Sequence, residues 1–281
     1  YWSVGIEDDF FSDMVDMDWG HDWHLIRRSG DALYFFCKQV WLAGKVRENW
    51  RESIRKCSDA FVRLWVREGQ FGQFVSQETG EIRVGRTASG AIASAGLALA
   101  ARLLRNPRYL EVAEESARYY VREFLDRGYT SGGPGEASQC PDSESAFGLL
   151  ESLVTLYEET GESAWIPLAE KAAWLAASWV MPYDFTFPPE SSFGRLDMRT
   201  TGTVWANVQN KHSAPGICTL SGVSLLKLYR ATGEPRYLEL CAQIGHAISQ
   251  YLSRADRPVF GMPDGWMCER VNTSDWERPQ T

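Results

Sequence analysis

Apolar residues recur at intervals of three and four along most of the chain, and this period predicts a largely helical protein. The first such stretch spans about residues 30–43 and is ended by Gly44, and the second spans about residues 49–68 and is ended by Gly69. Residues 69–87 instead alternate between apolar and polar on either side of a Thr-Gly pair. This alternation predicts a small β-hairpin between two pairs of helices.

The rest of the helical pattern is repetitive. Each of three segments contains a helix of small and apolar residues, a tight turn and an amphipathic helix, over residues 88–127, 143–181 and 217–253. A helix that is apolar on every side is buried on every side, so the first helix of each pair is expected in the interior. Together with residues 30–68, the chain holds four helical hairpins, and such repeats bury a shared core. Because no linker or change of composition divides residues 1–281, we expect a single domain.

The connections between hairpins are much longer than the turns within them. They span about residues 69–87, 128–142 and 182–216, and each leads into the N-terminus of an interior helix. In an array of up-down hairpins these N-termini lie at one end, so we expect the long loops to gather there, together with the acidic and aromatic residues 1–28. Long loops on a rigid scaffold are where functional sites are built.

Interior helices of small residues, amphipathic outer helices, Thr-Gly-Glu turns and long aromatic, acidic loops resemble the six-hairpin (α/α) toroid superfamily over about residues 30–253. That superfamily includes glycoside hydrolases, unsaturated-uronate hydrolases, polysaccharide lyases and sugar epimerases. The resemblance implies an all-α toroid whose acidic residues at interior-helix N-termini perform the chemistry. The chain departs from it in one respect, since four hairpins are recognisable and six would close a ring. Either the terminal segments add helices, or the chain is part of a longer one.

The connection YTSGGPGEASQCPDSESAF contains the first group of candidate residues. Its glycines and proline predict a loop, and Asp142 or Ser143 can cap the helix that follows. Glu144 falls in the first turn, where a carboxylate is favoured, and Glu136 precedes the cap as a substrate-binding candidate. Asp142 and Glu144 are therefore either a cap and a dipole partner or part of an acid/base pair.

The longest connection, residues 182–216, contains the second group. It carries Asp197, Arg195, Trp205, Asn207 and His212. Amides bind hydroxyls, an indole ring stacks on a sugar, and a guanidinium pairs with a sugar carboxylate. This set predicts an oligosaccharide or glycoside partner, including one that contains uronic acid.

Two aromatic residues before the first helix complete the candidate set. Trp19 and Trp23 lie in the sequence DWGHDWH at residues 18–24 and are further candidates for substrate binding. The histidines and aspartates of this sequence match no standard metal-ligand spacing, so we predict no metal and no other cofactor.

Glycoside hydrolysis needs two carboxyl groups, one as an acid and one as a base or nucleophile. We expect Asp142 to pair with Asp197 or with Glu144, and partial burial to raise the pKa of Asp142 so that it serves as the acid. The alternatives are a lyase or epimerase that uses His212 or a tyrosine for proton transfer, and a sugar-binding scaffold without activity.

Composition excludes several other classes. With 281 residues, 44% hydrophobic and a net charge of -8, the chain is not suited to nucleic acid or to an anionic membrane surface. No apolar run reaches the roughly 18 residues that span a bilayer. The six cysteines form no C-x-x-C pair. The first residue is Tyr1 and no signal peptide is visible, so a cytoplasmic and an exported protein both stay open, and the oligomeric state is not assigned.

Overall fold

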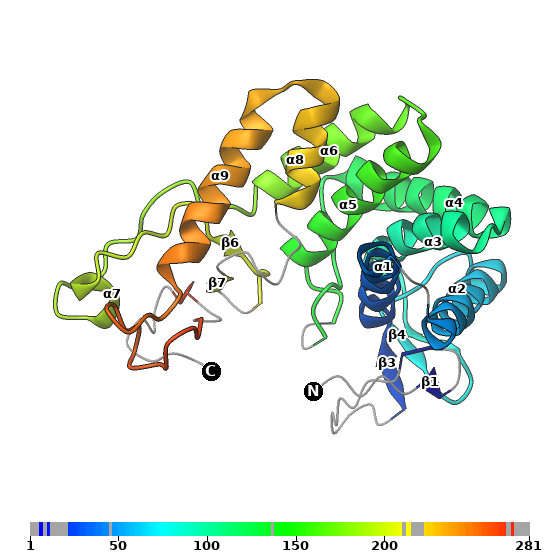
Figure 1. The fold of residues 1–281 in the computed structure, drawn as a ribbon, viewed down its shortest axis with the longest axis horizontal. Helices are drawn as coiled ribbons and strands as arrows, with labels where there is room; N and C mark the ends of the chain where they lie inside the picture. The colour runs from blue at the N-terminus through cyan, green and yellow to red at the C-terminus, as the bar shows by residue number, and fades with distance from the viewer. Residues whose placement is uncertain are drawn as a thin grey trace.

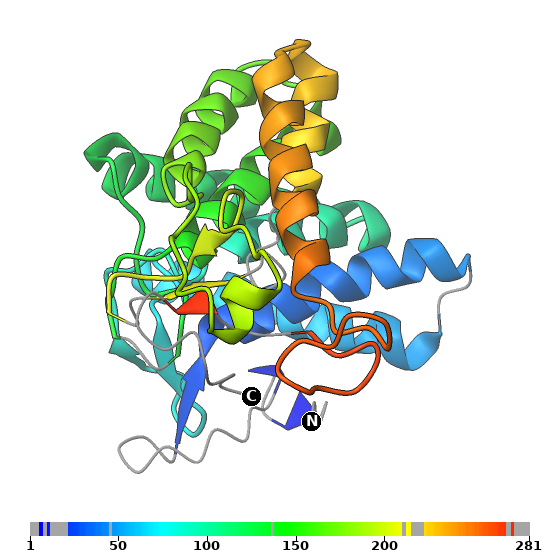
Figure 2. The same ribbon diagram turned by 90° about the vertical axis from the view of Figure 1, so that its left-hand side faces the viewer.

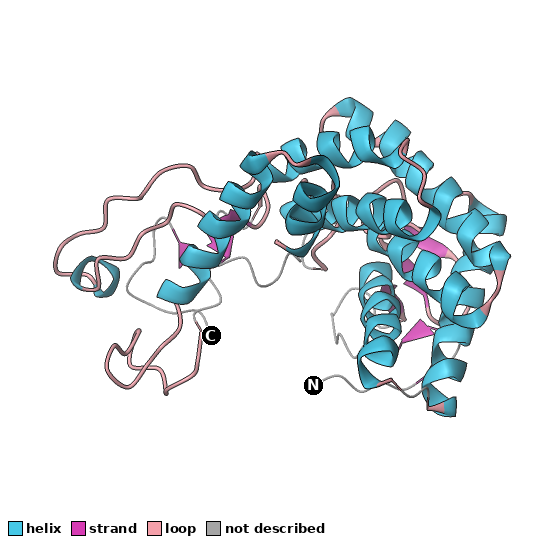
Figure 3. Cartoon of the chain, turned by 45° about the horizontal axis from the view of Figure 1, so that its top comes forward, coloured by secondary structure: helices cyan, strands magenta, loops and turns pink. Residues whose placement is uncertain are grey.

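The computed structural model describes residues 6–7, 10–11, 22–44, 47–135, 138–209, 212–214, 222–267 and 271–272. Its helices form an arc of antiparallel pairs, with the first pair at one end and the last pair at the other (Figures 1 and 3). Two candidates from the sequence, Trp19 and Glu136, lie outside the described residues.

All four predicted helical hairpins are present. The first helix of each pair belongs to an inner row in which neighbours pack side by side: α1 Ile26–Ala43, α3 Ala91–Leu104, α5 Ser143–Thr160 and α8 Val223–Thr232. Their partners form an outer row: α2 Glu48–Glu68, α4 Pro107–Glu123, α6 Trp165–Ala177 and α9 Pro235–Gln250. A 3₁₀ turn, Leu125–Arg127, follows α4. The N-termini of the inner helices all lie on the same side of the arc, where the long connections lead into them.

Tight turns within the hairpins set the antiparallel pairing. Gly161 ends α5 and Gly233 ends α8, with φ of 70° and 75°, a left-handed conformation that glycine adopts without steric cost. Their backbone N–H groups donate to Tyr157 O at 2.9 Å and to Tyr229 O at 2.7 Å. The glycines that the sequence pattern placed at these helix ends are confirmed.

The inner row packs closely because its contact faces are small. The buried residues of α3 run without interruption from Ala91 to Ala101, as the apolar pattern predicts. A Cβ on Gly96 of α3 would lie 2.9 Å from Leu33 Cγ of α1, too close for any larger side chain. This close approach positions α1, α3 and α5 next to one another. Although α3 is apolar all round, neither it nor any other described helix is long and apolar enough to cross a membrane.

The predicted hairpin between α2 and α3 is confirmed as β4 Phe74–Ser76 and β5 Ile82–Val84, and it gains a third strand, β3 Trp23–Leu25. Strand β3 pairs antiparallel with β4 and leads directly into α1. Helix α1 therefore starts at Ile26, four residues before the predicted start. Three residues are too few for an alternating pattern to show in the sequence.

The connection between α6 and α8 forms an arm beyond the end of the helical arc (Figures 1 and 2). It contains the short helix α7 Ser192–Arg195 and the strands β6 Val204–Trp205 and β7 His212–Ala214, and β7 pairs with β8 Val271–Asn272. Phe193 and Met198 of the arm form a small apolar cluster, separate from the main core, with Tyr251 and Val259 from the segment after α9. The first two strands, β1 Ile6–Glu7 and β2 Phe10–Phe11, pair with each other.

Candidate active site

Asp142 is the N-cap of α5, as the sequence predicts. Its backbone is extended, and its Oδ1 accepts from Ser145 N at 2.7 Å. Its Oδ2 accepts from Ser145 Oγ at 2.8 Å and from Gly133 N at 2.9 Å. These hydrogen bonds fix the glycine-rich connection onto the first turn of the helix.

The structure buries Asp142 completely rather than partially, with 0% of its surface exposed. Burial raises the pKa of its carboxyl, although the hydrogen bonds from Gly133 and Ser145 oppose the rise. Both oxygens are occupied by groups of the chain itself. In this arrangement the Asp142 carboxyl holds the glycine-rich connection and the first turn of α5 together.

Glu144, the second residue of α5, has a side chain that is 17% exposed, and its Oε2 atom is buried. Its Oε2 forms an ion pair with Arg27 Nη1, and Arg27 stands in the first turn of α1. The same guanidinium donates from Nε to Asp31 Oδ2 at 3.1 Å and from Nη1 to Gly133 O at 3.3 Å. The side chains of Arg27, Asp31 and Glu144 are 21%, 17% and 17% exposed. Two carboxyl groups from two inner helices thus meet on one arginine, and we call these three residues the mouth cluster.

Asp31 was not among the residues that the sequence indicated. Burial raises the pKa of its carboxyl, against the opposing charge of Arg27. A signal was present in the sequence, because Arg27, Asp31, Tyr34 and Lys38 recur at intervals of four, three and four, which puts polar groups on one face of α1.

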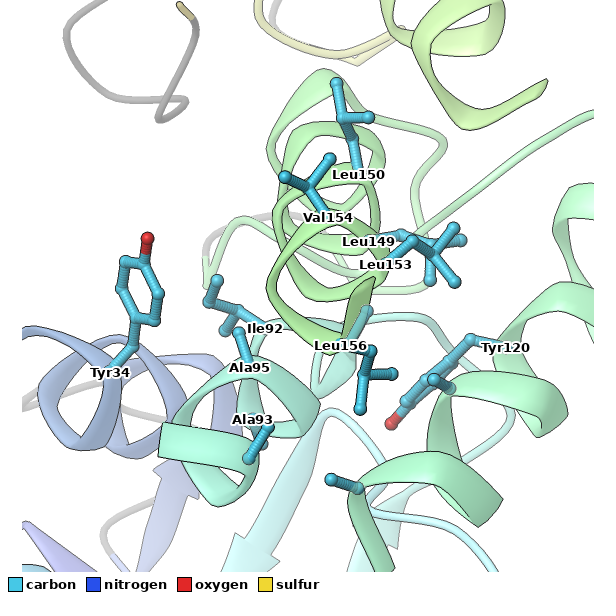
Figure 4. Packing of buried hydrophobic residues seen from close by; sticks show 14 of the residues in the cluster. Tyr34, Ile92, Ala93, Ala95, Tyr120, Leu149, Leu150, Leu153, Val154 and Leu156 are labelled. Carbon is cyan, nitrogen blue, oxygen red and sulfur yellow. The ribbon is translucent and has the colours of Figure 1, made fainter. Parts of the chain in front are cut away.

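The same face continues deeper along the inner row. Tyr34 Oη donates to Oε1 of Glu151, which lies in the middle of α5 and is 1% exposed. Lys227 of α8 reaches the same oxygen at 3.5 Å, and Lys38 Nζ lies 3.9 Å from it. Figure 4 shows Tyr34 beside Ile92 of α3, with its hydroxyl pointing past that helix rather than into it. Side chains of α1, α5 and α8 therefore meet on the concave side of the arc.

Part of the long loop reaches the Asp142 segment as expected. Asp142 and Asn207 form an isolated antiparallel bridge, and Val208 N donates to Pro141 O at 3.2 Å. Trp205 Nε1 donates to Asn207 O at 3.0 Å. Asn207 is 2% exposed and its Oδ1 accepts from the backbone of residue 209, so its amide supports the loop. The half-buried Trp205 ring therefore lies in the segment that pairs with Asp142.

The other candidates from the long loop lie elsewhere. Asp197 and Arg195 are exposed in the arm next to α7, which Figure 1 shows at the outer end of the molecule. The structure therefore does not bring Asp197 to Asp142, and the reason is that the apolar side chains around them, Phe193 and Met198, form the arm's own cluster. His212 contributes its backbone to β7, and its side chain is outside the described part.

Trp23, the remaining aromatic candidate, is half-buried on β3, directly before α1, and its ring centroid lies 5.7 Å from that of Phe74. It is thus close in sequence to the mouth cluster but packed into the small sheet. Within the ranges that the structure describes, no three His, Cys, Asp or Glu side chains are grouped so as to hold a metal ion.

Comparison with solved structures identifies the architecture. A D-mannose isomerase superposes with a TM-score of 0.60 at 12% identity, covering 92% of this chain and 67% of that one. The family 76 α-mannanase of Bacteroides thetaiotaomicron gives 0.56 at 12% identity, covering 89% and 64%. The unsaturated glucuronyl hydrolase of Bacillus sp. GL1 gives 0.57 at 14% identity, covering 82% and 64%.

The predicted fold is confirmed by these matches: the chain has the (α/α) toroid architecture. The structural neighbours are carbohydrate-processing enzymes, and the chain spans about two thirds of their length. No protein-family model matches the sequence, and no curated protein matches it.

Proposed function

We propose that the chain belongs to a carbohydrate-active enzyme that hydrolyses a glycosidic bond with Asp31 and Glu144. The observation that supports this proposal is the mouth cluster, in which Glu144 from the first turn of α5 and Asp31 from the second turn of α1 contact one arginine, each with a side chain that is 17% exposed. The fold, whose solved examples include glycoside hydrolases, favours the same conclusion.

The geometry is compatible with both hydrolytic mechanisms. Asp31 and Glu144 contact different nitrogens of one guanidinium, so their carboxyl groups lie apart by about the span of that group and two ion pairs. Hydrolases place their two carboxyls about 5 to 9.5 Å apart. Arg27 can bind a hydroxyl or a carboxylate of the sugar.

The two carboxyl groups have different surroundings, which assigns their roles. Burial raises the pKa of Asp31, so Asp31 is the proton donor. Glu144 is held as a carboxylate by Arg27 and acts as base or nucleophile. Asp142 supports both by fixing Gly133, whose carbonyl oxygen accepts from Arg27. Trp205, whose loop pairs with the Asp142 segment, and Trp23, which lies four residues before Arg27, are the aromatic groups that we propose stack on the sugar.

The test is turnover of oligosaccharides by the purified protein and by three variants. Probes are α-1,6-mannotetraose and an oligosaccharide with an unsaturated glucuronyl end, with released sugars measured by chromatography. We expect Glu144→Gln and Asp31→Asn to lose about 10²- to 10⁴-fold in kcat, the usual contribution of an acid/base group. Asp197→Asn is the matched control in the arm and should keep full activity.

An isomerase is the second candidate. It is favoured by the likeness to D-mannose isomerase and by the Tyr34 hydroxyl that Glu151 holds on the inner face. The same experiment separates the two functions, because an isomerase converts mannose without changing its mass and releases no shorter sugar. Full hydrolysis by both carboxyl variants would contradict the proposed roles.

A further inference from the structure

The group around Glu151 has no role in the proposed acid/base step. Glu151 is buried, yet every described partner of its carboxyl contacts the same oxygen, Oε1. Tyr34 Oη donates to it, Thr155 Oγ1 lies at 3.5 Å, and Lys227 Nζ lies at 3.5 Å. Among the described residues nothing donates to Oε2, which leaves a hydrogen-bond acceptor on the inner face of the arc.

Lys38 provides donors next to that acceptor. Its Nζ lies 3.9 Å from Glu151 Oε1, beyond hydrogen-bond distance, and 4.2 Å from the centroid of the Tyr34 ring. An ammonium group has three donors, and within the described part of the chain none of those of Lys38 is in a hydrogen bond. The side chain is 27% exposed. Burial lowers the pKa of Lys38, in keeping with a dry position for the ammonium group.

The other charged side chains near Glu151 and Lys38 form ion pairs of opposite charge. Lys227 Nζ lies 2.6 Å from Glu158 Oε2, and Arg102 Nε lies 3.3 Å from Glu159 Oε2. Glu151 is shared between Lys227, at 3.5 Å, and Lys38, at 3.9 Å. A ligand that brought its own charge would disturb this balance, whereas a neutral ligand with adjacent donors and acceptors would not. Neighbouring hydroxyls of a sugar have that property, because each donates one hydrogen bond and accepts others.

The position of this group relative to the mouth cluster is regular. Tyr34 follows Arg27 by seven residues, Lys38 follows Asp31 by seven, and Glu151 follows Glu144 by seven. Seven residues are about two helical turns, or about 10 Å along the helix axis. Both groups therefore face the same side of α1 and α5 at two depths.

We propose that Glu151 and Lys38 form a second saccharide subsite, deeper than the mouth cluster, that binds two adjacent hydroxyls of a neutral sugar unit. This proposal rests on the function proposed above. A substrate that extends past the scissile bond would place its neutral end there, with Glu151 accepting one hydroxyl and Lys38 donating to the next. The subsite selects against a charged sugar at that position.

The experiment measures binding without turnover, by calorimetry in the Glu144→Gln background, with mannose and α-1,6-mannotetraose as probes. We expect the tetrasaccharide to bind more tightly than mannose, and Lys38→Met to reduce the tetrasaccharide affinity at least 10-fold. Methionine keeps an unbranched side chain against Tyr34. Glu151→Gln, which keeps the acceptor for the tyrosine hydroxyl, should weaken the tetrasaccharide in the same way.

Lys171→Met is the matched control, since it removes a lysine that pairs with Asp126 at 2.7 Å on the outer helices. Equal affinity of the tetrasaccharide for the Lys38→Met, Glu151→Gln and control proteins would overturn the subsite and leave the proposed function intact. Absence of binding by every probe would overturn the proposed function and the subsite together.

Discussion

Asp142 at the N-terminus of α5 and Asp184 in the arm accept almost the same set of hydrogen bonds. Asp142 accepts from two backbone N–H groups and one hydroxyl, at 2.7 to 2.9 Å. Asp184 accepts from the N–H groups of Thr200 and Thr201 and from the Thr201 hydroxyl, at 2.8 to 3.0 Å. Nevertheless the pKa of Asp142 is raised and that of Asp184 is lowered.

The difference between the two is burial. Asp142 has lost all contact with solvent, and for such a carboxylate the cost of desolvation exceeds the gain from three hydrogen bonds. Asp184 is exposed, so its small desolvation is outweighed by the bonds from Thr201 and Thr200. Asp142 thus occupies a dry, interlocked position, and Asp184 occupies a solvated one. Chemistry that depends on shifted carboxyl groups belongs to the first.

The largest expected effect of this difference is on stability. Asp142→Ala leaves the buried N–H groups of Gly133 and Ser145 without an acceptor, and we expect it to lower the free energy of unfolding by about 3 kcal/mol. Asp184→Ala should cost about 1 kcal/mol, because water replaces the lost carboxylate. Urea denaturation of both variants measures the two values. Equal losses would show that the mouth is as solvated as the arm.

The next effect concerns the backbone that Asp142 holds. A Cβ on Gly133 would lie 2.3 Å from Asp142 Oδ1 and 2.9 Å from Glu144 Cβ, so Gly133→Ala must displace both carboxylates. We expect a loss of about 2 kcal/mol and a matching loss of activity. Gly135→Ala is the control in the same loop, since its nearest contact would be Leu25 Cδ2 at 3.3 Å. An active, stable Gly133→Ala protein would show that the loop is not interlocked as described.

The contrast also marks what the sequence could predict. Helical period, glycine turns and small-residue helices predicted the four hairpins and the Asp142 cap, because these depend on local pattern. The sequence puts Arg27 and Asp31 on one face of α1, but it does not show that Arg27 meets Glu144 of α5, since that ion pair depends on how closely α3 lets the two helices approach. Asp197 was predicted to lie beside Asp142 because the sequence shows that its loop is long. The sequence does not show that Phe193 and its neighbours give that loop an apolar cluster of its own.

A smaller effect is the pH dependence of stability. For Asp31 the folded pKa is raised, so the folded state binds the proton more tightly, and its contribution is present at low pH and is lost as the pH rises from about 4 through the folded pKa. For Asp184 the folded pKa is lowered, so its contribution is present above about pH 4 and is lost as the pH falls through the folded pKa. Each slope is at most about 1.4 kcal/mol per pH unit.

The measurement is the free energy of unfolding between pH 2.5 and 7 (a range chosen on the order of the carboxyl pKa values) for the wild type, Asp31→Asn and Asp184→Asn. As the pH falls, the free energy of unfolding of the wild type should rise relative to that of Asp31→Asn. Over the same fall in pH it should decrease relative to that of Asp184→Asn. If both differences in the free energy of unfolding change with the same sign, the result contradicts the difference in burial between Asp31 and Asp184.

The smallest effect is in the arm, at Asp197. Its φ is 48°, a left-handed conformation that glycine adopts more easily than aspartate, and no described residue bonds to its carboxylate. Asp197→Gly should therefore raise the stability by about 0.5 kcal/mol and leave turnover unchanged. Residue 133 must therefore be glycine because a Cβ there would be too close to Asp142, whereas residue 197 accepts either aspartate or glycine. Loss of turnover in Asp197→Gly, with the fold intact by circular dichroism, would instead bring the arm into the catalytic site and restore Asp197 as a partner for the carboxyl groups of α5.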